Sequence, residues 1–408
     1  MARLALITCR FTRCAPVGDA RRRLFATAST SPGGGRNGNS NGSGNGSAGA
    51  GPTATNSPPP HLDNRVKIVE VGPRDGLQNE KKSIPLATKI DLIERLARTG
   101  LSSIEAGAFV SPKWVPQMSN SGQILQHILQ RDIPSRTPLT FSFLAPNMTG
   151  MNDASAIFAR HPTAFETETQ RAASAAAGKT TAETTGQASK PAFEIAVFAA
   201  ATESFSQRNL NCDIATALAR FAPVIQAAKD GGLRVRAYIS VVLGCPFEGR
   251  DVDPHRVAEL ATDLLEMGAD EIALGDTTGM GTAPRTRALL ACLRSAGVLP
   301  EDLAMHFHDT YGQALVNTAV ALEHGIRTFD AAVGGLGGCP YSPGATGNVA
   351  TEDMVYFLES LGMRTGVDLD AVADIGAWIT REVGKPHESS VGKAVIGARS
   401  RAGSPETN

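Results

Sequence analysis

Short apolar runs alternate with longer segments of helical period along residues 65–390. The runs are rich in valine, isoleucine, phenylalanine and alanine, and their lengths are typical of buried strands. Eight of them occur, at 66–71, 102–109, 139–145, 194–200, 235–242, 271–276, 303–309 and 328–334. Helix signals fill the intervals: one segment begins at Pro254 and ends before Gly268, as helices commonly do. The pattern predicts successive strand–helix units on a parallel sheet.

Eight such units in about 325 residues match the size of a (β/α)8 TIM barrel with loop insertions. We therefore predict an α/β fold of this kind over residues 65–390, with an open doubly wound sheet as the alternative. A low-complexity stretch at 161–191 has no core-facing pattern and is predicted to be an insertion in a surface loop. Residues 391–408 are expected to form a flexible tail.

The N-terminal region differs in composition from the rest of the chain. Residues 1–30 carry six arginines against one acid, and Leu4, Ile7 and Phe11 share one helical face. This composition predicts a mitochondrial presequence and a location in the mitochondrial matrix, with a merely disordered basic tail as the alternative. Residues 31–64 are mostly glycine, asparagine, serine and proline, and are interpreted as a disordered linker.

Charge and cysteine usage narrow the class of protein. The 408 residues carry a net charge of −1, so there is no overall basic field to hold nucleic acid or an anionic membrane surface. No apolar run approaches the roughly 18 residues that a membrane span needs. The six cysteines are scattered without a CxxC pair, which indicates neither a zinc knuckle nor a disulfide framework. We expect a soluble enzyme with a small-molecule substrate.

His306 and His308 are the strongest local signal for chemistry. Residues two apart on a strand point the same way, so the seventh predicted strand brings two imidazoles to one site. Convergent histidines indicate a metal site, whereas two core histidines with satisfied hydrogen bonds are the alternative.

Arg74 and Asp75 directly follow the first predicted strand, in a turn fixed by glycines and a proline. This turn lies at the C-terminal mouth of a barrel, where Asp75 can reach the same centre as the histidines. An ordinary surface ion pair is the alternative. Asn348, after the last strand, offers an amide oxygen, and the mixed set of ligands suits Mg²⁺ or Mn²⁺.

Three further residues are candidates at the same mouth. Cys339 lies in the glycine-rich loop 334–340, which can carry its thiol over the site, although an inert loop thiol is the alternative. Glu105 and Asp276 lie on or at the ends of the second and sixth strands, where a carboxylate facing the barrel centre is unfavourable unless it binds something. For both, a structural ion pair is the alternative.

Six segments in order resemble the family of 3-hydroxy-3-methylglutaryl-CoA lyases over about residues 65–380: VEVGPRDGLQNE, AFVSPKWVPQM, LGCPFEG, LGDTTGMGT, HFHDTYGQA and GLGGCPYSPGATGNVATED. The Arg-Asp turn and the histidine pair also occur in related metal-dependent lyases and acyl-CoA condensing synthases. Cys339 in its glycine loop favours the lyases. The chain departs from the usual pattern at Ala273, where a serine is common.

The resemblance implies retro-Claisen cleavage of (S)-3-hydroxy-3-methylglutaryl-CoA to acetyl-CoA and acetoacetate, a step of leucine degradation and ketone-body formation. A condensing synthase of the same superfamily and a non-catalytic acyl-CoA-binding barrel are the alternatives. A homodimer is expected from the family.

The resemblance also implies roles for individual residues. Those expected to bind Mg²⁺ or Mn²⁺ are Asp75, His306, His308 and Asn348. Those expected in catalysis are Arg74, which would stabilise the enolate, Asp75, Glu105, Asp276, His306 and Cys339. Those expected near the acyl-CoA substrate are Arg74, Lys81 and Tyr238. The base is Asp276 or His306, a choice that the sequence leaves open, and Cys339 is the candidate acid.

Overall fold

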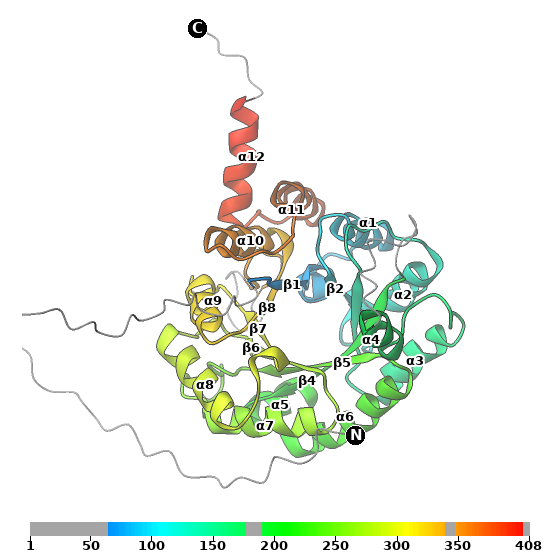
Figure 1. Cartoon of the computed structure of the whole chain (residues 1–408), viewed down its shortest axis with the longest axis vertical. Helices are drawn as coiled ribbons and strands as arrows, with labels where there is room; N and C mark the ends of the chain where they lie inside the picture. The colour runs from blue at the N-terminus through cyan, green and yellow to red at the C-terminus, as the bar shows by residue number, and fades with distance from the viewer. Residues whose placement is uncertain (1–63, 177–189, 339–346, 403–408) are drawn as a thin grey trace, which may run out of the picture. The chain divides into compact units, whose positions relative to one another are not determined.

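The computed structural model describes residues 64–176, 190–338 and 347–402. In this part of the chain, parallel strands follow one another around a closed barrel, and β8 pairs with β1 (Figure 1). The strands are β1 (Lys67–Glu70), β2 (Ser103–Ala108), β3 (Thr140–Leu144), β4 (Ala192–Ala200), β5 (Arg234–Ser240), β6 (Glu271–Asp276), β7 (Leu303–Phe307) and β8 (Thr328–Ala331).

The predicted TIM barrel is confirmed. Each of the eight apolar runs contains or overlaps one strand, and the β1–β8 pairing excludes the open sheet. The ends differ by a few residues: β4 starts at Ala192, and β7 stops at Phe307. His308 continues beyond β7 as an isolated bridge to Asn348, so the chain remains extended through both histidines.

Helices surround the barrel in Figure 1. They are α1 (Leu86–Ala97), α2 (Ser121–Gln130), α3 (Met148–Phe158), α4 (Glu168–Ala176), α5 (Glu203–Leu210), α6 (Ile214–Asp230), α7 (Pro254–Glu266), α8 (Ala283–Ser295), α9 (Ala314–Glu323), α10 (Thr351–Ser360), α11 (Leu369–Val383) and α12 (Ser390–Ala402). Short helical turns are η1 (Gly72–Gly76), η2 (Pro116–Met118), η3 (Pro300–Asp302) and η4 (Val333–Gly335). The α7 signals are confirmed: Asp253 caps the helix by accepting from the His255 amide, and Gly268 follows with φ 107°.

Charged residues cross the interior of the lower barrel. Lys67 of β1 pairs with Glu271 of β6 at 2.9 Å, and Arg236 of β5 pairs with Asp330 of β8 at 2.6 Å. Neither pair joins neighbouring strands, so both must span the inside of the barrel. A layer of small and aromatic side chains, including Tyr238, lies next to them. This charged layer was not predicted from the sequence.

Two predicted loop segments contain regular structure. The predicted flexible tail 391–408 is corrected over its first part, because Ser390–Ala402 form α12. The start of this helix is held by Asp353, whose carboxylate accepts from the Val391 amide. The predicted surface insertion 161–191 is likewise corrected over its first part: Phe165 is buried against Phe193, and Glu168–Ala176 form α4.

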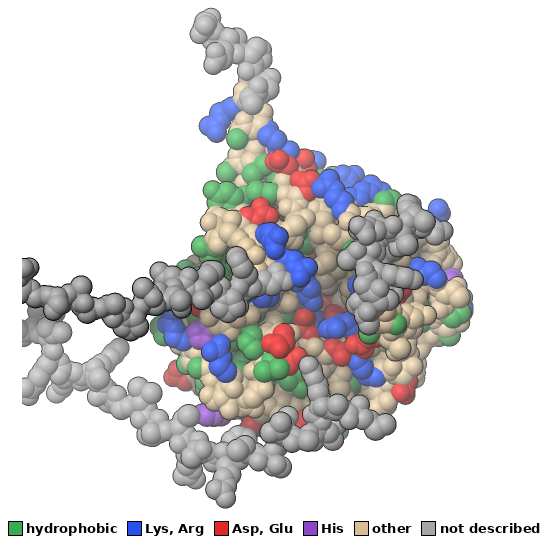
Figure 2. All heavy atoms as spheres, in the orientation of Figure 1, with side chains coloured by type: hydrophobic (Ala, Val, Ile, Leu, Met, Phe, Trp, Pro, Cys, Tyr) green, Lys and Arg blue, Asp and Glu red, His purple; other side chains and the backbone are tan. Residues whose placement is uncertain are grey.

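Several other expectations fall on residues outside the described ranges. These are the presequence 1–30, nearly all of the linker 31–64, residues 177–189 of the 161–191 segment and Cys339. Within the described residues, no helix combines the length and hydropathy required of a membrane span. Basic and acidic side chains are interspersed over the face seen in Figure 2.

Candidate active site

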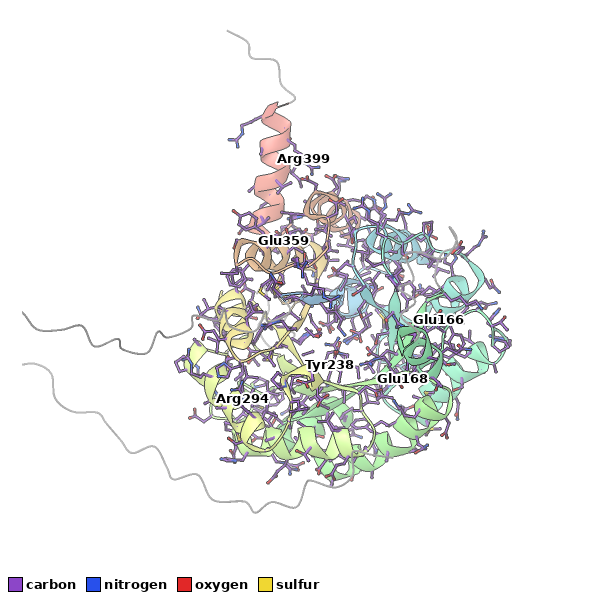
Figure 3. The ribbon with its side chains drawn as sticks, viewed as in Figure 1. Glu166, Glu168, Tyr238, Arg294, Glu359 and Arg399 are labelled. Atoms are coloured by element: carbon purple, nitrogen blue, oxygen red, sulfur yellow. The ribbon has the colours of Figure 1, made fainter. Side chains whose placement is uncertain are left out.

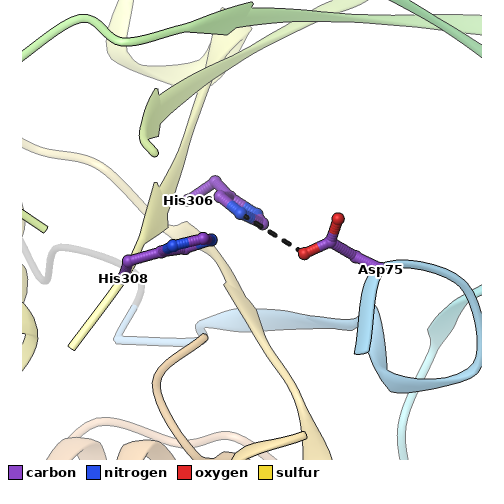
Figure 4. A group of neighbouring side chains, drawn as sticks. All are labelled: Asp75, His306 and His308. Atoms are coloured by element: carbon purple, nitrogen blue, oxygen red, sulfur yellow. Dashed lines mark ion pairs between the residues drawn. The ribbon is translucent and has the colours of Figure 1, made fainter. Parts of the chain in front are cut away.

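The two histidines of β7 and its extension lie together at the barrel mouth. His306 and His308 are 7% and 6% exposed, and their rings are 5.2 Å apart between centroids. Asp75 approaches them from the turn after β1, so that one ligand atom from each of the three residues lies within 4.8 Å of the others (Figure 4). The predicted convergence of these residues is confirmed.

The turn η1 places Arg74 beside this cluster. Close packing requires a glycine at the end of the turn, since a Cβ on Gly76 would lie 2.8 Å from the Leu336 Cβ. The Arg74 guanidinium donates through Nη1 to Asp75 Oδ1 and through Nη2 to Glu105 Oε2, each at 2.7 Å. Arg74 is 7% exposed. A buried guanidinium that is bonded on both sides has a fixed position, unlike the surface pair considered from the sequence.

Glu105 and Tyr238 extend the site beyond Arg74, and the Tyr238 ring meets the His306 ring edge to face, with centroids 5.9 Å apart. The Tyr238 hydroxyl donates to Glu105 Oε2 at 3.1 Å, and Figure 3 shows Tyr238 in the interior of the barrel. Burial raises the pKa of Glu105, against the opposing charge of Arg74, and burial also raises the pKa of Tyr238 well above its ordinary value. The tyrosine therefore keeps its proton and acts as a donor.

The donor set fits a divalent cation. Burial opposes ionisation of Asp75, but Arg74 and the two histidines outweigh it and hold the Asp75 pKa below its usual range, so this carboxylate is charged at neutral pH. Burial also lowers the pKa of His308 to about 4, which leaves that imidazole neutral. The Nδ1 atom of His308 is buried and has no hydrogen-bond partner among the described residues. A charged carboxylate and a neutral imidazole with an unused nitrogen are suitable ligands.

Asn348 lies beside this candidate metal site. Its amide nitrogen donates to Asp75 Oδ2 at 2.8 Å, so the side chain contacts a predicted ligand. A half-turn of the amide would exchange its nitrogen for its oxygen. The role of Asn348 as a fourth ligand stays a prediction.

Two predicted site residues form no hydrogen bond or ion pair with the cluster in the described structure, although Asp276 interacts electrostatically with His306. The Asp276 carboxylate accepts from the Gly281 amide at 3.0 Å at the end of β6, and burial raises its pKa to about 7. Its Oδ1 atom has no hydrogen-bond partner in the described part of the chain. Lys81 is exposed.

Asp330 and Arg236 are two site residues that the sequence analysis missed. Asp330 Oδ2 is 3.0 Å from His306 Nδ1, and Asp330 Oδ1 accepts from Arg236. Arg236 also donates to the Tyr238 hydroxyl at 3.5 Å. The available signal was alternation, because Arg234, Arg236 and Tyr238 stand at every second position of an otherwise apolar run.

A groove of about 500 Å³ opens beside the site, above strands β2 to β4. Its inner part is apolar, and Val110, Leu144 and Phe198 there pack with the layer that contains Tyr238. Its outer part includes the exposed side chains of Arg208 and Arg220. The groove therefore joins an apolar channel to a basic rim.

A fixed guanidinium, a carboxylate–histidine cluster and a buried tyrosine at the C-terminal mouth of a TIM barrel define a barrel enzyme with a candidate metal centre. The HMGL-like family model matches residues 65–379, and the chain belongs to this family. The 3-hydroxy-3-isohexenylglutaryl-CoA/hydroxymethylglutaryl-CoA lyase of Pseudomonas aeruginosa is 47% identical over 336 residues, which are 82% of this chain and 99% of that protein.

Two further comparisons agree. The mitochondrial hydroxymethylglutaryl-CoA lyase of Rattus norvegicus is 44% identical over 334 residues, 82% of this chain and 90% of that protein. The crystal structure of hydroxymethylglutaryl-CoA lyase from Pseudomonas aeruginosa superposes with a TM-score of 0.69 and covers 83% of this chain and 99% of that chain, at 47% identity. The family match from residue 65 to residue 379 contains all eight strands of the barrel.

Proposed function

We propose that this protein is a carbon–carbon lyase that cleaves (S)-3-hydroxy-3-methylglutaryl-CoA to acetyl-CoA and acetoacetate. The observation that carries the proposal is Arg74, which is held between Asp75 of the candidate metal cluster and Glu105. This arrangement sets a permanent positive charge beside the place where a metal would hold the substrate. The relatives are named as lyases, so the condensing reaction is not favoured.

Asp75, His306 and His308, with the amide oxygen of Asn348, would hold the metal, which we propose to be Mg²⁺ or Mn²⁺. When bound, it supplies a Lewis acid that makes the C3 hydroxyl of the substrate easier to deprotonate. The charged Asp75 and the neutral His308 are already in the protonation states that ligation requires.

Cleavage begins when a base on the protein takes the proton of the C3 hydroxyl. The electron pair of that O–H bond becomes the carbonyl of acetoacetate as the C2–C3 bond breaks. The two electrons of the broken C2–C3 bond remain on C2. This fragment is the enolate of acetyl-CoA, whose negative charge lies mainly on the thioester oxygen. Arg74 meets this charge, while Glu105 and Tyr238 keep the guanidinium in place.

Asp276 and His306 are the two candidates for the base, and we propose Asp276, because His306 would bind the metal through Nε2 and contacts Asp330 through Nδ1. The Asp276→Asn variant distinguishes them, because an amide oxygen can still accept from the Gly281 amide but the side chain cannot take a proton. Lost turnover in this variant assigns the base to Asp276, and retained turnover assigns it to His306.

The reaction ends when C2 receives a proton. Cys339, which lies outside the described residues, is the proposed acid because a thiol with an ordinary pKa near 8.5 can donate to a carbanion at neutral pH. The acyl-CoA substrate would run along the groove, with its apolar arm against Leu144 and Phe198 and its phosphates near Arg208 and Arg220. Lys81 is exposed at the same mouth and is a further candidate contact for the acyl-CoA.

The matrix location expected from the sequence and the homodimer expected from the family remain part of the proposal. Support comes from the arginine-rich residues 1–30 and from the mitochondrial relative of the rat. A reporter fused to residues 1–30 should enter mitochondria, and light scattering of the purified protein should give twice the chain mass. The role in leucine degradation and ketone-body formation would follow from the location and the products.

The main test is release of acetoacetate and acetyl-CoA from the substrate by the purified full-length chain with Mg²⁺. Release should stop when EDTA is added and should fall strongly in Cys339→Ser. Cys292→Ser is the matched control, because Cys292 lies on α8 and has a half-buried thiol. A folded protein that releases neither product with either metal would contradict the proposal and direct attention to condensation of a 2-oxo acid with acetyl-CoA.

A further inference from the structure

Asp330 lies beneath the candidate metal site, and each of its carboxylate oxygens has one partner. Oδ2 is 3.0 Å from His306 Nδ1, and Oδ1 accepts from Arg236 Nη2 at 2.6 Å. Asp330 is 2% exposed and Arg236 is 1% exposed. The buried ion pair with Arg236 holds Asp330 as a charged carboxylate.

We propose that Asp330, anchored by Arg236, is a positioning residue that fixes His306 in the tautomer whose Nε2 lone pair faces the metal site. This inference rests on the proposed metal-dependent function. An ionised carboxylate can only accept hydrogen bonds, so its contact with Nδ1 requires a proton on that nitrogen. In the neutral ring, Nε2 then carries the lone pair, and Nε2 is the atom that lies 3.9 Å from Asp75 Oδ2.

The geometry gives this role to Asp330 alone among the residues described around His306. His308 depends on a different contact, a hydrogen bond with the Thr277 backbone, so loss of Asp330 should release one histidine and leave the other. Asp330 and His306 are register partners on adjacent strands, which keeps their backbones at a constant separation.

Arg236 fixes the position of the Asp330 carboxylate, because the guanidinium is itself held in place. Its Nε lies 3.1 Å from Glu271 Oε1, and Glu271 in turn pairs with Lys67, so the guanidinium is held from below as well as from above. Through the Tyr238 hydroxyl, Arg236 also connects to the Glu105–Arg74 pair. Arg236 thus contacts both the residue that positions His306 and, through Tyr238, the residues that hold Arg74.

The Asp330→Asn variant makes the proposal testable, because Arg236 can only donate. The amide oxygen of the new side chain must therefore turn toward Arg236, and its NH₂ group must turn toward His306 Nδ1. That nitrogen becomes an acceptor, the ring proton moves to Nε2, and the lone pair no longer faces the metal site. A similar exchange in the serine-protease triad leaves the geometry intact but imposes the wrong tautomer.

The decisive measurement is ¹⁵N–¹H correlation NMR of the histidine rings in metal-free full-length protein at alkaline pH, with the His306 signal assigned by its loss in His306→Gln. The wild-type protein should show the proton on Nδ1, and Asp330→Asn should show it on Nε2. A wild-type proton on Nε2 would overturn the proposal even if the variant does not fold.

Binding of Mn²⁺, measured by electron paramagnetic resonance, gives a second readout that does not depend on turnover. Loss of an outer partner of a ligand histidine typically weakens metal affinity about 10- to 100-fold, and we expect a change of this size in Asp330→Asn. Asp270→Asn is the matched control, since Asp270 is a half-buried carboxylate that pairs with Lys229 of α6 at 2.8 Å and does not contact Arg236 in the described structure. It should keep wild-type affinity.

Wild-type Mn²⁺ affinity in a folded Asp330→Asn protein, with the proton still on Nδ1, would refute the positioning role. Failure of the proposed function looks different: the wild-type protein would bind no Mn²⁺ or release no product, whereas the tautomer of His306 in the metal-free protein would still decide the present inference.

Discussion

Arg74 has little freedom to move, because Asp75 and Glu105 each bond one of its terminal nitrogens at 2.7 Å. A lysine at this position would carry the same charge but could not bond both carboxylates as a planar fork. We expect Arg74→Lys to lower kcat by roughly 100- to 1,000-fold, the usual effect of removing a donor that stabilises an oxyanion, and to change KM much less. Steady-state kinetics on the acyl-CoA substrate measures both constants.

The control for this substitution is Arg98→Lys, at an exposed residue whose pair with Glu94 is 3.9 Å long. It should leave both constants unchanged. If Arg74→Lys instead raised KM and kept kcat, the guanidinium would serve substrate binding and would have no special role in the transition state.

Some site residues could be predicted from the sequence and others could not. His306, His308, Arg74 and Asp75 could be predicted because each has a local signal, either a spacing of two on a strand or a glycine-bounded turn. Asp330 has no such signal. Its role depends on the partner of His306 across the β7–β8 ladder, and this register is fixed only when the barrel closes.

Among the elements, β1, η4 and α10 meet at one buried carboxyl group. Glu70 Oε1 accepts from the amides of Gly72 and Val333, each at 2.9 Å, and Oε2 accepts from the Thr351 hydroxyl at 2.6 Å. Burial is the largest influence on Glu70, and despite these donors its pKa rises from 4.5 to about 7. This junction lies at the base of the glycine loop.

The raised pKa of Glu70 makes the stability of the junction dependent on pH. A carboxyl group with a higher pKa in the folded state binds more protons there, so its contribution is complete below about pH 4.5 and is lost as pH rises through about 7. The free energy of unfolding falls by about 3 kcal/mol over this range. Glu70→Gln cannot ionise, and we expect it to gain stability relative to the wild type between pH 5 and pH 8.

Urea denaturation at the two pH values measures this difference in the free energy of unfolding. Glu382→Gln, at an exposed position of α11, is the control and should follow the wild type. Identical pH dependence in wild type and Glu70→Gln would mean that Glu70 ionises in the folded protein as it does in the unfolded chain.

The groove between β2–β4 and α5–α6 provides a test of acyl-CoA binding. Reversing the charge of Arg208 or Arg220 at its rim should raise KM roughly 5-fold for an exposed charge contact worth about 1 kcal/mol, with kcat unchanged. The effect should shrink as salt is added. Arg287→Glu on α8 is the control because it lies outside the groove, and an equal rise of KM there would point to overall charge as the cause.

For the molecule as a whole, metal binding should stabilise the folded state. A ligand at 100 times its Kd adds about 2.7 kcal/mol to the free energy of unfolding, so Mn²⁺ should raise the Tm of the full-length chain and EDTA should reverse the rise. Asp75→Asn should fold but show little response to Mn²⁺. An equal Mn²⁺ shift in that variant, measured by calorimetry, would place the cation somewhere other than the Asp75 cluster.

The barrel could be predicted because each strand is an apolar run between helix signals, and eight such units closely match one architecture. The α12 helix could not be predicted, because its sequence is short, basic and only weakly apolar and so carries no clear helical pattern. It forms where Asp353 and Ser389 satisfy its first amides, contacts that require α10 to be in place. Phe165 was missed for a similar reason, since a polar segment conceals its burial beside Phe193.

The chain of ion pairs from Lys67 through Glu271 and Arg236 to Asp330 has a consequence for how this barrel can evolve or be redesigned. In many barrels the lower face can vary for stability while the upper face varies for chemistry. Here a continuous chain of ion pairs connects the two faces. A change of charge in the lower layer would therefore alter Asp330 and, through it, His306 at the mouth. A lineage of this protein should therefore change its lower layer only through compensating pairs of substitutions.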